Sequence, residues 1–475
     1  MKKTKTTLLF TFMVIYCHTA ESGNFTFAET SAIGQKLLEA PDNSWIRVNE
    51  NKFNEVWRPE SLRPNTLGGP YSIIQAWGSM AWDSNRGDLI FYGGGHGNYA
   101  GNEVYRWRAS SLKWERASLP SQIKRIAGSP PHPDYTAIDG VFNAPVAAHT
   151  YDNNEYLPIA DRFVTFGGAA YNTGATFRRL DGARTGPYFW DPSKADANKV
   201  GGTTGSQVDS NILGGNMWQN RNNLSGFANS PQQGGKLAIL TNGATAYTEE
   251  NGKDVLFVQS KNDLYKYTVN DVNDPLSDTY ELVGIAWKTF NGKGAGAYSP
   301  SQNLFLRSSG NTKNFNYWQL DLSGAGNRNT NFVPTVLGEV DFDFEKLGEY
   351  GMEFDSVRNR FLLWGGDSDV WALTPPEDLA NFNEDWTLEL LSGIAEGEDG
   401  LPSLADIGTF TGVLGKWKYS EELDVFLGVV DPVKGDVWAY KPDNWLASNV
   451  PIPASFYFFF ASILLLFAKN RRTEK

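Results

Sequence analysis

Histidine, the side chain best suited to proton transfer near neutral pH, is scarce in this chain of 475 residues, which has four. His18 lies in an apolar stretch near the N-terminus, which leaves His96, His132 and His149 for a folded domain. His96 lies in a glycine-rich loop over residues 93–102, and His132 lies between prolines in a long connection. Because the ordinary pKa of histidine is near neutral pH, each of the three is a candidate acid or base.

A tyrosine and several arginines complete a set of residues that suits proton abstraction from a carbon next to a carboxylate. Tyr171 follows a second glycine pair, and it could share the work of base and acid with His96 and His149. An arginine would neutralise the carboxylate, because a guanidinium pairs with it through two hydrogen bonds. The candidates for this arginine are Arg184, Arg221 and Arg307. This set predicts β-elimination on a uronate-containing polysaccharide.

Each of these residues also has a structural alternative. His96 could brace the glycine loop, His149 could be buried under the rim of a channel, and Tyr171 could pack within its loop. Each arginine could be solvated or could hold the fold together. The sequence leaves both interpretations open.

Other chemistries lack the residues that they need. The single cysteine, Cys17, lies in the N-terminal apolar stretch, which excludes disulfide scaffolds, Fe–S clusters and copper sites built on a Cys–Tyr crosslink. The histidines do not have the spacing of zinc ligands, and no GxSxG turn is present. With 42 basic and 54 acidic residues the formal charge is −12, which disfavours nucleic acid as a partner. We expect no catalytic metal and no cofactor, and the sequence leaves a structural metal open.

Both ends of the chain have the features of sorting signals. Residues 1–20 combine lysines, an apolar stretch and small residues, which is typical of a secretory signal peptide. Residues 450–475 combine a Val-Pro-Ile-Pro-Ala-Ser motif, an apolar stretch and a basic end. This tail resembles the PEP-CTERM signals that an exosortase processes in Gram-negative bacteria, and a plain transmembrane anchor is the alternative. Both interpretations predict an exported protein, at the cell surface or secreted, with one folded domain over residues 21–445.

The middle of the chain repeats one pattern. A strand, a polar turn, an apolar strand, a glycine pair and a third strand with Trp or Tyr recur in six units, which begin near residues 78, 148, 245, 296, 351 and 415. A seventh unit could lie in residues 205–245. Units this small cannot bury a core alone and must stack on one another. The sequence therefore predicts an all-β protein, a single β-propeller of six or seven four-stranded kelch-like blades.

Propeller geometry predicts which candidate residues share a face. The first strand of a blade is innermost, and the loop that leads into it opens on the same face as the loop between the second and third strands. His96 and Tyr171 are predicted in such second-to-third loops of neighbouring blades, and His149 at the start of a first strand. The last unit lacks a fourth strand, which residues 44–48 could supply to close the ring.

The glycine pairs and aromatic third strands resemble kelch repeats. The loop around His96, together with Tyr171, resembles secreted marine-bacterial lyases that cleave ulvan, a sulfated algal polysaccharide, on a β-propeller. This resemblance implies a catalytic set of His96, His149, Tyr171 and Arg184. It implies substrate contacts by Gln75, Asn98, Tyr99, Tyr188, Arg221 and Arg307. The chain departs from the family at Gln75, where a histidine would precede the glycine loop, and His149 would take that place.

Two alternatives remain. The first is a kelch-type module that binds a glycan or a protein of an exopolysaccharide layer without cleaving it. The second is a glycoside hydrolase that uses paired carboxylates, for which Asp367, Asp369 and Asp431 are candidates. The expected partner of the enzyme is an acidic polysaccharide. Processing by an exosortase and a monomeric state are further expectations.

Overall fold

The computed structural model describes residues 31–125, 135–172, 174, 176–180, 184–222, 241–260, 263–287, 292–321, 326–379, 385–395 and 400–445. The predicted signal peptide, the predicted C-terminal sorting segment and His132 lie outside these ranges. Within them, we find no helix with the length and apolar character needed to cross a lipid bilayer.

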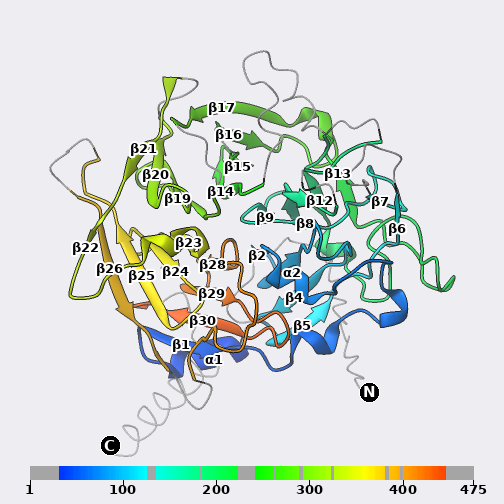
Figure 1. The fold of residues 1–475 in the computed structure, drawn as a ribbon, viewed down its shortest axis with the longest axis horizontal. Coiled ribbons are helices and arrows are strands. Elements are labelled where there is room, and N and C mark those ends of the chain that lie inside the picture. The colour runs from blue at the N-terminus through cyan, green and yellow to red at the C-terminus, as the bar shows by residue number, and fades with distance from the viewer. Residues whose placement is uncertain are drawn as a thin grey trace, which may run out of the picture.

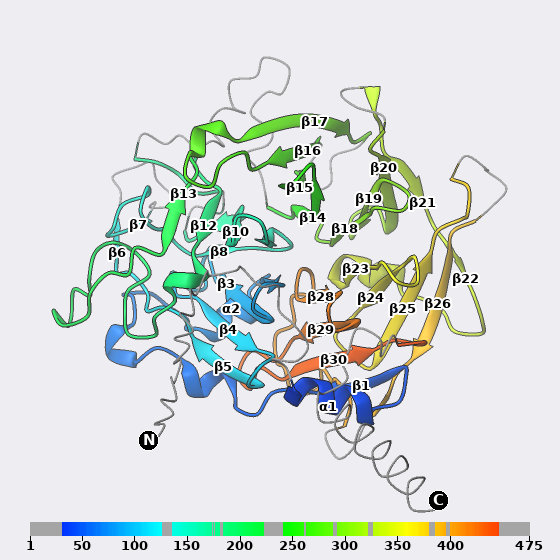
Figure 2. The same cartoon turned by 180° about the vertical axis from the view of Figure 1, so that it is seen from behind.

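The described part of the chain is a six-bladed β-propeller, seen from one face in Figure 1 and from the other in Figure 2. Six antiparallel sheets stand around a central axis, and the inner strand of each sheet contacts the inner strand of the next. The inner strand of the sixth blade contacts that of the first, so the ring is complete. The predicted all-β propeller is confirmed, with six blades.

The strands of the blades, from the inner to the outer edge, have the following bounds. Blade 1 contains β2 (Ser79–Asp83), β3 (Asp88–Tyr92), β4 (Tyr105–Arg108) and β5 (Lys113–Arg116), and blade 2 contains β9 (Asn154–Leu157), β10 (Arg162–Thr165), β12 (Tyr188–Trp190) and β13 (Trp218–Asn220). Blade 3 contains β14 (Ala244–Glu250), β15 (Lys253–Gln259), β16 (Asp263–Thr268) and β17 (Thr279–Ile285), and blade 4 contains β18 (Gly296–Ser299), β19 (Leu304–Ser309), β20 (Asn314–Gln319) and β21 (Thr330–Phe332). Blade 5 contains β23 (Gly351–Asp355), β24 (Arg360–Trp364), β25 (Asp369–Thr374) and β26 (Thr387–Ser392), and blade 6 contains β28 (Trp417–Ser420), β29 (Val425–Val429), β30 (Val437–Lys441) and β1 (Ser44–Arg47).

A few further elements decorate the blades. Two outermost strands add in parallel, β22 (Thr335–Val336) to blade 5 and β27 (Ile394–Ala395) to blade 6. Two small antiparallel pairs join β6 (Ile123–Arg125) with β7 (Tyr135–Ala137), and β8 (Ala148–His149) with β11 (Ala169–Ala170). The helices are α1 (Ser31–Glu39) and α2 (Tyr71–Gln75), with 3-10 turns at Phe53–Val56, Glu60–Leu62, Pro192–Lys194, Pro275–Ser277 and Phe344–Glu349.

The alternation of side chains along a strand explains why the blades must stack. In β3, Leu89 and Phe91 pack in the core between blades 6 and 1, whereas Ile90 and Tyr92 pack between blades 1 and 2. Successive side chains of a strand point to opposite faces, so apolar residues at every position need a neighbour on both sides. The four apolar residues of β3 are buried for this reason, and Asp88 at its start is buried against Arg106 and Arg108.

The N-terminal strand β1 closes the ring. It pairs antiparallel with β30, in a register that sets Trp45 opposite Tyr440, and so becomes the fourth strand of blade 6. The closure predicted for residues 44–48 is confirmed. Lys441 Nζ on β30 donates a hydrogen bond to the carbonyl oxygen of Leu37 at 3.0 Å, which ties α1 to the same blade. Both figures show α1 beside β1 and β30.

The structure decides between the six and seven blades that the sequence left open, and it corrects the start of one predicted strand. No seventh blade forms in the described part of residues 205–245, where the chain makes the connection to β13, then β13 itself and the start of β14; residues 223–240 lie outside the described ranges. The first strand of blade 2 begins at Asn154 and not at His149. A polar residue can start this buried strand because Asn154 Nδ2 donates to the carbonyl oxygens of Ser79 and Tyr92, each at 3.1 Å.

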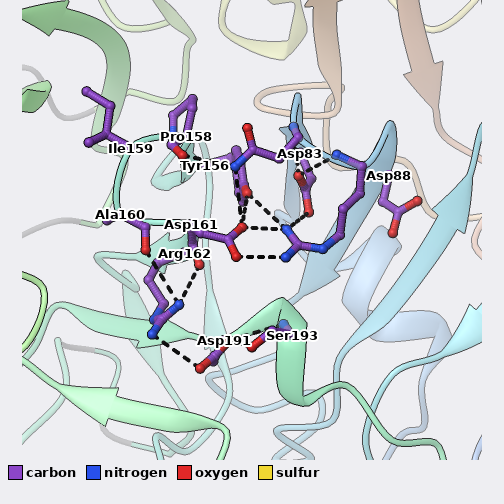
Figure 3. Close-up of polar contacts among 12 residues, drawn as sticks. Asp83, Asp88, Tyr156, Pro158, Ile159, Ala160, Asp161, Arg162, Asp191 and Ser193 are labelled. Carbon is purple, nitrogen blue, oxygen red and sulfur yellow. Dashed lines mark hydrogen bonds and ion pairs between the residues drawn. The ribbon is translucent and has the colours of Figure 1, made fainter. Parts of the chain in front are cut away.

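An ion-pair cluster joins the first turn of blade 1 to the first turn of blade 2 (Figure 3). Arg86 donates to both oxygens of Asp161, at 2.5 and 2.7 Å, and to Asp83 Oδ2 at 3.1 Å. The hydroxyl of Tyr156 donates to Asp161 Oδ1 at 2.5 Å. Burial alone would raise the pKa of Asp161, but the hydrogen bonds from Arg86 and Tyr156 outweigh it and lower this pKa to about 2.

The same arrangement recurs between blades 5 and 6. Arg358 donates to Asp355 Oδ1 at 3.0 Å and to Asp424 Oδ2 at 2.7 Å, and the hydroxyl of Tyr419 donates to Asp424 Oδ1 at 2.8 Å. Arg86 and Arg358 each lie three residues after an aspartate that ends an inner strand. The repeated unit therefore carries a polar contact between blades in addition to its apolar core.

Candidate functional site

The loops that lead into the inner strands and the loops between second and third strands lie at one end of the ring, which we call the histidine face. This follows from the pairing of inner and second strands, in which Ser79 at the start of β2 faces Tyr92 at the end of β3. His96 follows β3 of blade 1, and His149 lies in β8, in the segment that leads into blade 2. The two histidines therefore meet where blades 1 and 2 adjoin.

The glycine loop is bonded to blade 2 through its backbone. His96 has φ 35°, and its N–H donates to the carbonyl oxygen of Ala169 at 3.1 Å. Its own carbonyl oxygen accepts from the N–H of Asn172 at 2.8 Å. Gly95, with φ 45°, lies so close to Ala148 that an added Cβ would fall 2.2 Å from its carbonyl carbon. The glycines are needed because the loop turns in a left-handed conformation directly against β8.

The two imidazole rings form an edge-to-face pair. Their centroids are 5.7 Å apart at an interplanar angle of 84°. The His96 side chain is exposed, whereas His149 is only 2% exposed and packs on Trp77 with a centroid distance of 4.7 Å. His96 is therefore the ring of the pair that a ligand can reach.

His149 is held neutral in the folded protein. Burial, with a smaller contribution from the nearby His96, lowers the pKa of His149 to about 3. Nε2 of His149 lies 2.9 Å from Oδ1 of Asn98. Because an amide oxygen only accepts hydrogen bonds, Nε2 carries the hydrogen and Nδ1 keeps its lone pair. Asn98, predicted as a substrate contact, thus orients His149.

The lowered pKa predicts a pH effect on stability. The unfolded chain protonates this histidine near pH 6.5 and the folded chain only near pH 3, so folding stability is lost as the pH falls through that window. We expect this loss to be about 1.4 kcal/mol per pH unit below about pH 6. Denaturant unfolding between about pH 5 and 7 should show a shallower pH dependence for His149→Gln than for the wild type. His96→Gln is the control; an equal slope in the wild type and His149→Gln would contradict the prediction.

Tyr171 and Arg184 lie in the connection between β10 and β12 of blade 2, which also contains β11, the strand that pairs with His149 in β8. Tyr171 directly follows β11, is 7% exposed and contacts Tyr135 ring to ring at 5.5 Å. Burial raises the pKa of Tyr171, which keeps its phenol protonated. Arg184 is partly buried and pairs through its backbone with Arg178. Burial and the charge of Arg178 lower the pKa of Arg184.

Tyr99 and Tyr188, which were predicted as substrate contacts, are core residues, and this corrects the prediction. Tyr99 is 0% exposed; its hydroxyl donates to Glu103 Oε1 at 2.6 Å and accepts from Arg58 Nε at 3.0 Å. Tyr188 is equally buried, and its hydroxyl donates to the carbonyl oxygen of Val141 at 2.6 Å. Each hydroxyl has a partner inside the protein, so the whole ring can be buried.

Two predicted arginines are also structural. Arg221 is fully buried and donates to both oxygens of Asp278, at 2.9 and 2.8 Å. Arg307, equally buried, donates to Gln259 Oε1 at 3.0 Å and to the carbonyl oxygen of Asn242 at 2.7 Å. Burial lowers the pKa of Arg307 to about 10, while Asp152 opposes the shift. Neither guanidinium faces solvent, so neither can neutralise a substrate carboxylate.

Residues that the sequence interpretation missed line the mouth of the ring on the histidine face. Lys293 Nζ lies 5.9 Å from the centroid of the Trp77 ring and donates to the carbonyl oxygen of Thr411 at 3.0 Å. Gln75, predicted as a substrate contact, donates to the carbonyl oxygen of Thr409 at 3.2 Å. The sequence signal for Lys293 is its position shortly before an inner strand, which Gln75 and Trp77 share.

A buried lysine lies beneath this mouth. Lys416 Nζ donates to the carbonyl oxygens of Gly78 and Gly412, at 3.1 and 2.8 Å. Burial, with the nearby charge of Lys293, lowers the pKa of Lys416 to about 7. Among the residues that the structure describes, no group of three or more His, Cys, Asp and Glu is arranged to hold a metal ion.

The chain is similar to known proteins in its fold but not detectably in its sequence. No protein-family model and no curated protein sequence matches the chain. Among solved structures, the chain is similar to an auxiliary nutrient binding protein from Bacteroides thetaiotaomicron, with 10% identity over 82% of this chain and 75% of that one and a TM-score of 0.40. It is also similar to an α-L-arabinofuranosidase from Fusarium graminearum, with 8% identity over 82% of this chain and 97% of that one and a TM-score of 0.37. A xyloglucanase from Xanthomonas campestris is similar with 13% identity over 74% of this chain and 56% of that one and a TM-score of 0.31. At these values none assigns an activity, and the resemblance to ulvan lyases stays a prediction.

Proposed function

We propose that the protein is a polysaccharide lyase whose site lies on the histidine face between blades 1 and 2. The observation that carries the proposal is the pair of histidine rings 5.7 Å apart, one exposed and one buried and neutral. Because His149 is buried and neutral, the exposed His96 ring is the member of the pair that a substrate can reach and that can act as the base. In this role His96 is the base, and His149 and Asn98 position the loop that carries it.

The proposed reaction is β-elimination at a uronate residue. His96 takes the C5 proton, the electron pair forms the C4–C5 double bond, and the C4–O bond breaks. The leaving oxygen takes a proton from Tyr171, whose buried phenol is kept protonated. Lys293 and Arg184 are the residues proposed to neutralise the uronate carboxylate and so stabilise the developing negative charge; Lys293 would exchange its ion pair with Glu349, 3.4 Å away, for the substrate.

The two ends of the sequence support a proposed location outside the cytoplasm. Residues 1–20 and 450–475 support export of the domain to the cell surface or beyond, with exosortase processing of the tail. A uronate-containing, sulfated polymer of the ulvan type is the proposed substrate, and the active form is proposed to be a monomer. Local cations at the site would offset the overall charge of −12.

The test is an assay of the purified protein on ulvan and other uronate polymers, followed through the ultraviolet absorbance of the new double bond. We expect activity in the wild type and about a hundredfold loss in His96→Ala, because a positioned acid or base contributes at least that factor. Lys313→Ala is the control, because this exposed residue lies on the same face in the second-to-third loop of blade 4. Glycan binding without any double-bond product would favour the non-catalytic kelch module instead.

A further inference from the structure

A second cavity opens on the ring axis at the face opposite the histidines. It has a volume of about 520 Å³ and is lined by residues from the ends of all six inner strands and the turns that follow them. Its size lies within the range of small-molecule sites in proteins. The proposed lyase reaction uses none of its residues.

The floor of this cavity holds more carboxylates than cations. Lys418 Nζ lies 2.9 Å from Glu353 Oε1, 3.2 Å from Glu155 Oε1 and 4.0 Å from Asp152 Oδ1. Asp152 accepts one further hydrogen bond, from the N–H of Gly296 at 2.8 Å. Burial raises the pKa of Glu353 and of Asp152 in spite of the attraction of Lys418. Among the residues that line the cavity, Lys418 is the one basic side chain at the floor and Glu155 and Glu353 are its acidic partners; a bound cation that approached these two carboxyl groups would favour their charged forms.

Aromatic side chains and further carboxylates form the wall and the rim. The aromatic lining residues are Trp82, Tyr156, Tyr247, Tyr298, Phe354 and Tyr419. Glu249 and Glu421 at the rim are exposed, and Glu422 accepts a hydrogen bond from Trp82 Nε1 at 2.9 Å. The lining thus contains five glutamates and a single lysine. An aromatic ring attracts a cation through its face, and this attraction is strongest where carboxylates nearby add to it.

We propose that this cavity binds a small organic cation, such as an amine or a quaternary ammonium group. Three observations support this ligand class: a cavity of suitable volume, an excess of carboxylates over cations, and a wall of aromatic side chains. The described residues offer no cluster suited to a metal ion, which favours an organic cation over a divalent metal. This site is independent of the histidine face.

The test is isothermal titration of the purified protein with tetramethylammonium chloride. Neopentyl alcohol, a neutral molecule of similar shape, and sodium chloride at equal ionic strength are the comparison ligands. We expect saturable binding of tetramethylammonium and of neither comparison ligand. The affinity for tetramethylammonium should be about tenfold lower in Glu353→Gln and a few-fold lower in Glu421→Gln. Glu421 is exposed, so its variant keeps the test valid if loss of Glu353 disturbs the fold.

Glu345→Gln is the matched control, because this exposed glutamate lies outside the cavity in the 3-10 turn Phe344–Glu349. It should bind tetramethylammonium as the wild type does. Equal binding of neopentyl alcohol, no saturable binding of the cation, or unchanged affinity in both cavity variants would overturn the proposal. Activity of the histidine face should be unchanged by Glu421→Gln.

Discussion

Replacing Trp45 by alanine should lower the free energy of unfolding by about 3–5 kcal/mol, the cost of removing a large buried aromatic side chain. The Trp45 ring is fully buried and lies 5.3 Å from the ring of Trp364, 5.7 Å from that of Trp417 and 5.1 Å from that of Tyr440. Its Nε1 donates to the carbonyl oxygen of Ser368 at 2.9 Å. The substitution removes the main apolar anchor of the strand that closes the ring.

Denaturant unfolding followed by circular dichroism would measure this loss. Trp287→Ala is the control, because Trp287 is 67% exposed and should cost less than about 1 kcal/mol. A loss in Trp45→Ala as small as in the control would mean that β1 contributes little to holding blade 6.

Replacing Arg221 by methionine should cost a similar amount, about 3–5 kcal/mol, because it leaves a buried carboxylate without its cation. Arg221 and Asp278 have fully buried side chains, and the guanidinium also donates to the carbonyl oxygens of Val272 and Asp271, at 2.6 and 2.7 Å. It stacks on Phe189 at 4.7 Å from the ring centroid. Methionine fills most of the volume but satisfies none of these acceptors.

Arg328→Met provides the comparison for this second substitution. Arg328 is exposed and stacks only on the exposed Trp287, so its loss should change stability by less than about 0.5 kcal/mol. If Arg221→Met were as stable as the wild type, its ion pair with Asp278 would not be needed for the fold. A stable Arg221→Met variant without lyase activity would restore this arginine as a site residue.

The propeller could be predicted from the sequence because its signals are local. A strand, a glycine pair and an aromatic third strand recur within each unit, and β1 could be matched to the blade that lacked a fourth strand. The exact number of blades could not be predicted from the sequence, because an outer strand such as β13 has one sheet neighbour and a short, weak sequence pattern. The start of β9 was missed because Asn154 and Glu155 are polar, and their buried partners, such as Thr245, come from other blades.

The site was predicted in part for the same physical reason. The repeats reveal the order and direction of the strands, and these directions place His96 and His149 on the same face, where their rings are in contact. The burial of Arg221 and Tyr99 could not be predicted in this way, because it depends on Asp278 and Glu103, which become their partners only in the folded chain. One signal was available in the sequence: Asp83 and Arg86 have the same spacing as Asp355 and Arg358, and each of the two arginines pairs with an aspartate of the next blade.

The pairing of β1 with β30 has a consequence for the timing of folding. Ser44 and Lys441, which lie opposite each other in this pair, are separated by almost the whole described chain. At a synthesis rate of about 5–20 residues per second, β1 exists for roughly 20–80 s before its partner is made. During this interval its backbone N–H and C=O groups are an exposed sheet edge, open to pairing with other chains. Ring closure is thus the last long-range step available to the nascent chain. A chaperone that covered β1 until β30 is made would raise the yield of folded protein.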